Sequence, residues 1–182
     1  GYGAGADETA SELNALAGVQ ATATTTATLL RTNPAAVPPS TFTNNGSFMI
    51  NGVALTSTDI PDFTAMRDEI NDLSSSTLFG ISAEVDANGN LVVTSATGRD
   101  LAFSFSAAGG VAEVQGAQGA LQTVNNATQA IKIGGEIDIT MDEGYSIVTS
   151  QPTVPVFGGS MFGSINVPNF FTQVPINAFD PN

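Results

Sequence analysis

The residues that could do chemistry in this chain are mainly carboxylates, because the sequence contains no histidine and no cysteine. Ser-His-Asp triads, Cys-His pairs and His-ligated zinc sites are therefore excluded. The densest acidic group is Asp138, Asp142 and Glu143, beside a strand-like segment flanked by glycines. Carboxylates serve acid–base catalysis when they are buried and perturb each other. This polar setting is typical of solvated turns, so we expect no catalytic residues and no enzyme activity.

A second group of oxygen ligands, Asp86, Asn88 and Asn90, has the alternating spacing with which a calcium loop begins. An EF-hand loop starting at Asp86 would need glycine at its sixth position and a bidentate glutamate at its twelfth. The sequence has Leu91 and Thr97 at those positions. A hairpin turn accounts for the same residues, so we expect no metal site and no cofactor.

Three short motifs have ordinary structural explanations. Residues 98–100 contain the letters of an integrin-binding tripeptide in the wrong order and are typical of a polar turn. Residues 45–47 and 126–128 match the N-glycosylation pattern, which is common by chance and matters only in a host with the machinery. The exposed serines and threonines would suit O-linked sugars equally well. Neither modification follows from the sequence.

The composition limits the partners of this chain. Its 182 residues include 17 acidic and 4 basic side chains, for a formal net charge of −13. That charge repels nucleic-acid phosphates and anionic lipids, so neither nucleic acid nor membrane is an expected partner. Hydrophobic residues make up 42% of the chain, which is enough for a core. Charged residues make up only 12%, so uncharged polar and small residues must cover most of the surface.

The elements that must position these residues begin with a short helix. Acidic residues near Asp7 favour a helix start, and the helix is expected to cover only the first half of the segment up to about Leu30. The alternation of alanine and threonine in residues 21–28 indicates an extended segment or a loop. The prolines between Asn33 and Ser40 indicate a linker, which we interpret as a boundary.

The segment from residue 46 to 106 predicts a strand, a helix and three further strands. The strand ends at an Asn51-Gly52 turn, and a second Asn-Gly pair joins the hairpin strands 80–85 and 91–95. The expected helix, at about 60–75, has an apolar face that should pack against Leu91 and Val93 of the sheet. This face consists of Ile60, Phe63, Met66, Ile70 and Leu73. The last strand of the unit is expected at 101–106.

The region after Gly110 is polar and rich in glycine up to about Ala130. Short strands are expected at 130–133, 135–140 and 145–149. The tail from residue 151 onward contains five prolines and five phenylalanines, which indicates an irregular ribbon anchored on a core.

Four motifs in residues 48–106 occur in a familiar order. They are Phe-Met-Ile-Asn-Gly-Val at 48–53, Met-Arg-Asp-Glu-Ile-Asn at 66–71, the hairpin 81–95 and the Gly-Arg-Asp turn at 98–100. This order and spacing resemble the "ING" repeat of bacterial flagellins and related hook-associated proteins. The long terminal helices by which flagellins polymerise are missing from this chain.

The resemblance implies an α+β fold made of small β-rich modules, one of which packs a helix on an antiparallel sheet. Residues 41–106 would form the ING-type module, and residues 1–40 with 107–182 a β-rich module. The chain would be the variable outer region of a flagellin-like filament protein, extracellular, structural and without catalytic activity. Its partners would be other flagellin subunits, through segments absent from this chain, and host or environmental surfaces. The isolated chain is expected to be a monomer.

An alternative is an adhesin-like or hook-associated domain that binds a glycan or a protein in a groove between the modules. Exposed aromatic rings would favour this alternative, because sugar binding uses planar side chains as platforms. A further expectation follows from the flagellin resemblance: an inserted region must leave its parent chain and return to it. The segments near Gly3 and Phe179 should then lie side by side as antiparallel strands, above a cluster of Phe170, Phe171 and Phe179.

Overall fold

The structure is a computed structural model that describes residues 5–33, 40–43, 48–56, 63–107, 109–125 and 130–144. The helices in these ranges are α1 (Ala6–Asn14) and α2 (Phe63–Leu73). The strands are β1 (Val19–Leu30), β2 (Thr32–Asn33), β3 (Ser40–Thr41), β4 (Phe48–Ile50), β5 (Val53–Ala54), β6 (Ile81–Val85), β7 (Leu91–Ser95), β8 (Leu101–Phe105), β9 (Val111–Gly116), β10 (Gln122–Asn125), β11 (Ile131–Ile133) and β12 (Glu136–Met141). The predicted α+β class is confirmed, with α2 packed on an antiparallel sheet. Neither described helix is long and apolar enough to cross a membrane.

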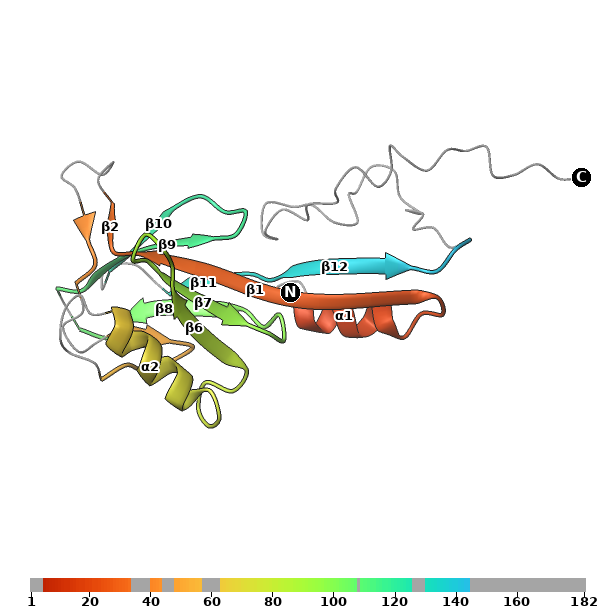
Figure 1. Cartoon of the computed structure of the whole chain (residues 1–182), viewed down its shortest axis with the longest axis horizontal. Coiled ribbons are helices and arrows are strands. Elements are labelled where there is room, and N and C mark those ends of the chain that lie inside the picture. Colours follow the sequence, from red (N-terminus) through yellow and green to blue (C-terminus); the bar gives the residue numbers. More distant parts are fainter. Residues whose placement is uncertain are drawn as a thin grey trace, which may run out of the picture.

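The long strand β1 runs through the molecule and divides it into two parts (Figure 1). We call one part the stalk; it consists of α1, β12 and the first half of β1, which pairs with β12 from Val19 to Thr24. We call the other part the head; it contains α2, the remaining strands and the second half of β1. In the head, β1 pairs with β7 on one side and with β9 on the other.

The sequence of β1 explains how one strand serves both parts. Apart from Thr25, alanine and leucine at the odd-numbered positions alternate with threonine, and the strand buries these positions from Ala21 to Leu29. This period of two is the pattern of a strand with one covered face. Of the two expectations for residues 21–28, the extended segment is therefore confirmed and the loop is wrong.

Besides the pair of β2 and β3, the head contains two sheets. The larger has the strand order β10-β9-β1-β7-β6, and the smaller has the order β11-β8-β4-β5. The hairpin of β6 and β7, the Asn51-Gly52 turn between β4 and β5, and the strand β8 agree with the sequence-based expectations. However, β8 pairs with β4 and β11 rather than with the hairpin, so the strands of residues 46–106 are divided between the two sheets.

Beyond β2 and β3 at the predicted linker, two further strands lie where the sequence predicted none. The glycine-rich region after Gly110 forms β9 and β10, which pair with each other, and β9 also pairs with β1. Strand β9 buries Ala112, Glu113 and Val114 consecutively, so it lacks the simple alternation by which strands are recognised. The expected short strands β11 and β12 are present.

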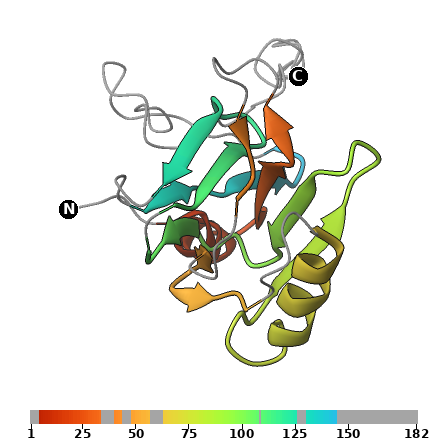
Figure 2. The same cartoon turned by 90° about the vertical axis from the view of Figure 1, so that its left-hand side faces the viewer.

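The hydrophobic core of the head lies between the two sheets and under α2, which lies along the β6–β7 hairpin (Figure 2). Phe63, Met66 and Ile70 of α2 are buried in the same cluster as Leu91 and Val93, which confirms the predicted apolar face. Phe42 packs edge-on against both Phe48 and Phe63, at ring-centroid distances of 5.4 and 5.0 Å. Such edge-to-face contacts add to the stabilisation from burial.

The core of the stalk is small and separate. Ala6 and Ala10 of α1 pack on Ala21 and Ala23 of β1, with partly buried side chains from α1 and β12 around them. Alanine side chains allow the helix to approach the strands closely. An isolated pair of strands is marginally stable in water, so the cover provided by α1 accounts for the extension of β1 and β12 beyond the head.

The predicted modules 41–106 and 1–40 with 107–182 share a sheet and a core in the structure, because β1 and β9 join the β6–β7 hairpin. At the predicted linker, β2 pairs antiparallel with β3. Several expectations fall outside the described residues. They are the linker residues 34–39, the start of the predicted helix with Ile60, the strand 145–149, the tail with Phe170, Phe171 and Phe179, the two glycosylation patterns, and the segment near Gly3.

Candidate functional site

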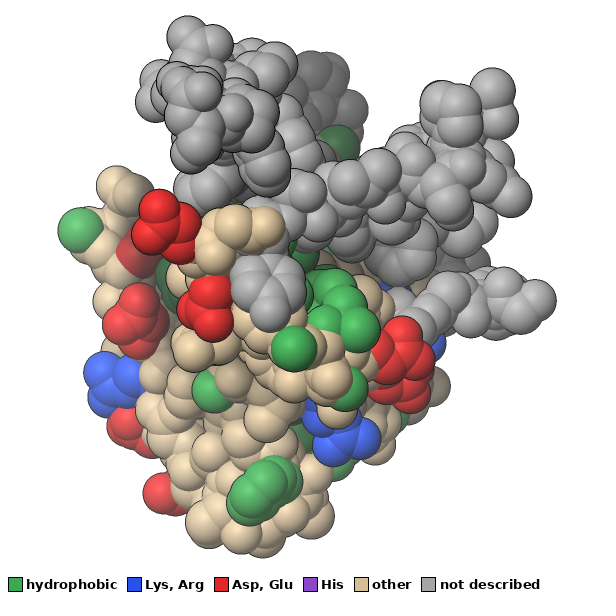
Figure 3. Space-filling model, turned by 90° about the vertical axis from the view of Figure 1, so that its right-hand side faces the viewer, with side chains coloured by type: hydrophobic (Ala, Val, Ile, Leu, Met, Phe, Trp, Pro, Cys, Tyr) green, Lys and Arg blue, Asp and Glu red, His purple; other side chains and the backbone are tan. Residues whose placement is uncertain are grey.

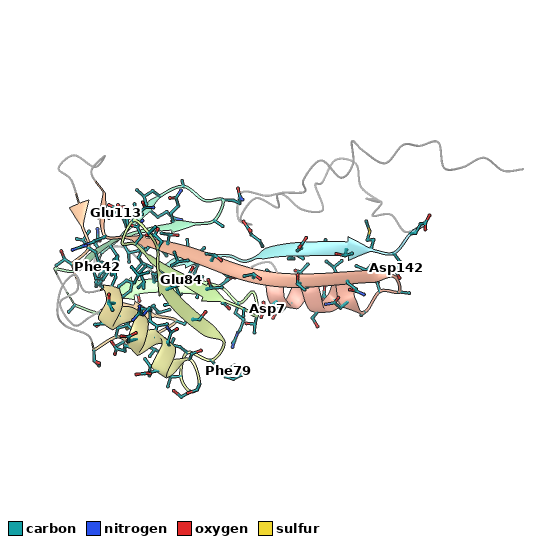
Figure 4. All side chains as sticks on the ribbon, in the orientation of Figure 1. Asp7, Phe42, Phe79, Glu84, Glu113 and Asp142 are labelled. Atoms are coloured by element: carbon teal, nitrogen blue, oxygen red, sulfur yellow. The ribbon has the colours of Figure 1, made fainter. Side chains whose placement is uncertain are left out.

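A pocket of about 530 Å³ lies at the junction of stalk and head. Four segments that are distant in the sequence line it: the start of α1, the β4–β5 turn, the loop from α2 to β6, and the turn between β7 and β8. Its volume is in the range of roughly 300–1,000 Å³ that is typical of small-molecule sites. Figure 4 shows Asp7, at the start of α1, and Phe79, at the end of the α2–β6 loop, on the same side of β1.

The side chain of Asn51 ties two walls of the pocket together. Its Nδ2 donates a hydrogen bond to the carbonyl of Asp100 (3.2 Å), and its Oδ1 accepts one from the backbone N–H of Ala102 (2.7 Å). The backbone N–H of Asn51 also donates to the carbonyl of Ala102 (2.8 Å). Asn51 has a φ of 50°, a left-handed conformation that asparagine tolerates better than most residues. The Asn-Gly turn and the Gly-Arg-Asp turn are thus directly linked.

The same turn is also fixed on β1 through Gly98. This residue is buried with a φ of +74°, and a Cβ atom at this position would clash with the side chain and backbone of Ala23. Glycine is the residue that permits both this conformation and this approach. Gly135 is similarly confined, since a Cβ there would lie 2.5 Å from Oγ1 of Thr25 and 2.7 Å from the carbonyl of Gly98. The junction of stalk and head is therefore closely packed.

The loop that presents Phe79 is held by its neighbours. Leu78 is buried; its N–H donates to the carbonyl of Leu73 (2.9 Å), and its carbonyl accepts from the N–H of Ile81 (2.9 Å). Gly80 has a φ of +75°, which reverses the chain into β6. Phe79 stands between these fixed residues with 69% of its surface exposed.

The pocket carries several ionisable groups. Asp7 and Glu8 lie at the start of α1, and Arg99 and Asp100 lie in the opposite turn. No hydrogen bond or ion pair joins the side chains of these four residues to others within the described ranges, where Arg67 and Asp68 form the single ion pair. Buried Ser95 at the inner side of the pocket hydrogen-bonds through its hydroxyl to Thr97 (3.3 Å).

The acidic group predicted from the sequence lies elsewhere. Asp138 is exposed on β12, and Asp142 and Glu143 are exposed beyond its end. The N–H of Asp142 donates to the carbonyl of Gly18 (2.9 Å), which closes the end of the stalk. Figure 3 looks at this end of the molecule, where acidic side chains lie scattered among uncharged polar ones. No described residues form a group of three or more possible metal ligands.

The carboxylate of Asp86 is used within its own hairpin. Its Oδ1 accepts hydrogen bonds from the backbone N–H groups of Asn88 and Asn90 (both 2.8 Å), and its Oδ2 accepts one from Nδ2 of Asn90 (3.1 Å). The hydrogen bond from the Asn90 backbone, supported by the others, lowers the pKa of Asp86 below its ordinary value of 3.8. These contacts are those of a turn, as the sequence indicated.

The pocket does not follow from the sequence. Asp7 and Glu8 predict only a helix start there, residues 98–100 predict a polar turn, and Phe79 carries no predicted role. The available signal was the apolar pair Leu78-Phe79 between the polar run 74–77 and Gly80. Comparison of the chain with protein-family models and with curated proteins found no match.

Proposed function

We propose that this chain is the outer, surface-displayed part of a flagellin-like bacterial filament protein, with a structural and non-catalytic role outside the cell. The observation that carries the proposal is the direct contact between the motifs of the flagellin resemblance. Strand β12 runs antiparallel to the first half of β1, and α1 packs on both, so these three elements form one stalk. The head projects from the other end of β1 (Figure 1).

The motifs that carry the flagellin resemblance contact one another through two asparagine side chains. Asn51 of the first motif binds the turn at Asp100, and Asn71 of the second binds Ala83 of the hairpin. Motifs joined in this way belong to one structural unit, which supports their interpretation as a repeat with a common fold.

The charge and surface of the chain fit display on a filament. A net charge of −13 disfavours association of the outer regions with one another. The exposed face of β1 and β12 carries threonine and aspartate, including the opposed pair Thr22 and Asp138. Contacts between subunits would then be made by polymerising segments that lie outside this chain.

A graft tests the proposal. The chain would replace the outer domains of a well-characterised flagellin, between its polymerising terminal segments, in cells that lack their own flagellin. We expect filaments whose surface carries an additional projection in cryo-electron microscopy. The same flagellin without an insert is the control for assembly. Filaments that form only in this control would contradict the proposal, because an outer region must tolerate assembly of its parent.

A further inference from the structure

We propose that the pocket between stalk and head binds a carbohydrate, with a neutral or amino-sugar ring stacked on Phe79 and its hydroxyl groups bonded to the polar side chains of the rim. This binding activity goes beyond the structural role proposed above. It commits to one class of ligand, a polyhydroxylated pyranose without acidic substituents.

Phe79 provides the stacking surface. It is 69% exposed, whereas the other described phenylalanines, of which Phe105 is the most exposed at 8%, are buried. An exposed ring offers a flat apolar face, against which the C–H groups of a pyranose can pack. The buried Leu78 and the left-handed Gly80 fix the loop on both sides of the ring. The backbone that carries the ring is therefore held in place before a ligand arrives, which reduces the entropy lost on binding.

The rim supplies hydrogen-bonding groups suited to a sugar. The carboxylates of Asp7, Glu8 and Asp100 accept hydrogen bonds, and the guanidinium of Arg99 donates up to five. Two adjacent hydroxyl groups of a pyranose can hydrogen-bond together to the two oxygens of a carboxylate or to two nitrogens of a guanidinium. Because Asn51 and Gly98 fix the turn that carries Arg99 and Asp100, these two side chains start from a rigid backbone.

The charge of the pocket selects among ligands. Three carboxylates and one guanidinium belong to residues that line the pocket, and the whole chain has a net charge of −13, so acidic sugars and phosphates are repelled. A purely apolar ligand would desolvate these carboxylates without replacing their hydrogen bonds to water. A neutral sugar satisfies the carboxylates, and an amino sugar also gains from their charge.

The test is a printed glycan array that presents neutral, amino and acidic glycans to the whole chain, followed by calorimetry with the best-bound free oligosaccharide. We expect binding to neutral or amino glycans. Phe79→Ala should weaken binding at least tenfold, and Asp100→Asn should also weaken it. Leu16→Ala is the matched control, because Leu16 is another exposed hydrophobic residue (56%) outside the pocket, and this variant should bind like the wild type.

Phe79→Ala is expected to fold, since its side chain lies outside the core, and circular dichroism verifies this before binding is measured. Three outcomes would overturn the proposal: no binding to any neutral or amino glycan, binding restricted to acidic glycans, or binding that Phe79→Ala leaves unchanged. The last outcome would place the sugar elsewhere on the surface.

Discussion

The side-chain amide of Asn71 binds both backbone groups of Ala83, with its Nδ2 donating to the Ala83 carbonyl (3.0 Å) and its Oδ1 accepting from the Ala83 N–H (2.8 Å). Ala83 pairs with Val93 on its other side, so the amide of Asn71 occupies the place of a missing strand. Asn14 binds Ala21 of β1 in the same way, with both distances at 2.7 Å. Unpaired strand edges promote aggregation. These amides bind the backbone N–H and carbonyl groups at the edge and connect each helix to its sheet.

Replacement of Asn71 by alanine should therefore lower the free energy of unfolding by about 1 kcal/mol, since two hydrogen bonds at a partly buried edge are lost while water can replace some of them. Asp72→Ala is the matched control, because Asp72 is exposed on the same helix turn. Urea denaturation measures both variants. Equal midpoints for the two would show that the Asn71 amide does not stabilise the edge.

Phe63→Ala should destabilise the protein by about 3–5 kcal/mol, the usual range for removal of a core phenylalanine. Phe63 is 3% exposed and contacts Phe42 at the centre of the head. Phe79→Ala serves as the control, because it removes an equally large side chain from the surface and should change stability little. The two urea midpoints decide the matter; a Phe63 variant as stable as the Phe79 variant would refute the core assignment.

Gly98 and Gly52 separate the effect of a steric clash from that of backbone strain. Both have φ between +70° and +80°, but a Cβ would clash with Ala23 at Gly98 and meets nothing within 4 Å at Gly52. Gly52→Ala should cost about 1–2 kcal/mol from the left-handed conformation. Gly98→Ala should cost about 1–3 kcal/mol more, since it overpacks the junction. Thermal unfolding of both variants tests this order, and a Gly98 variant that is no less stable would exclude a tight junction.

The hairpin at Asp86 should weaken in acid. The pKa of the Asp86 carboxyl group is lowered in the folded chain, chiefly by the hydrogen bond from the Asn90 backbone. Because the pKa is lower in the folded chain, the ionised carboxylate stabilises the fold at pH values above the ordinary pKa of 3.8. This stabilisation is lost as the pH falls through the pKa of the folded chain. In Asp86→Asn the side-chain oxygen can keep its backbone hydrogen bonds but cannot titrate. The stability difference between wild type and variant should therefore shrink between pH 5 and pH 2, which a pH series of denaturation midpoints measures. A difference independent of pH would contradict this prediction.

The isolated chain should be a soluble monomer at neutral pH, because a net charge of −13 opposes self-association. Multi-angle light scattering should give a mass close to 18.5 kDa. If the Asn71 and Asn14 amides protect the strand edges, the monomer mass should also be found at moderate salt, where charge repulsion is screened. A dimer or filament in either condition would contradict this prediction.

The elements whose signals are local can be predicted from the amino-acid sequence. The apolar spacing of Phe63, Met66 and Ile70 predicted α2, and the Asn-Gly pairs predicted the β4–β5 turn and the β6–β7 hairpin, because helix periodicity and turn geometry depend on neighbouring residues. Tertiary structure decided which strands share a sheet. Strands β9 and β10 depend on pairing with one another and with β1, and no nearby residue signals such a distant partner. The pocket has the same origin, since it exists only where Asn51, Asp100, Phe79 and the start of α1 are brought together by contacts between segments far apart in the chain.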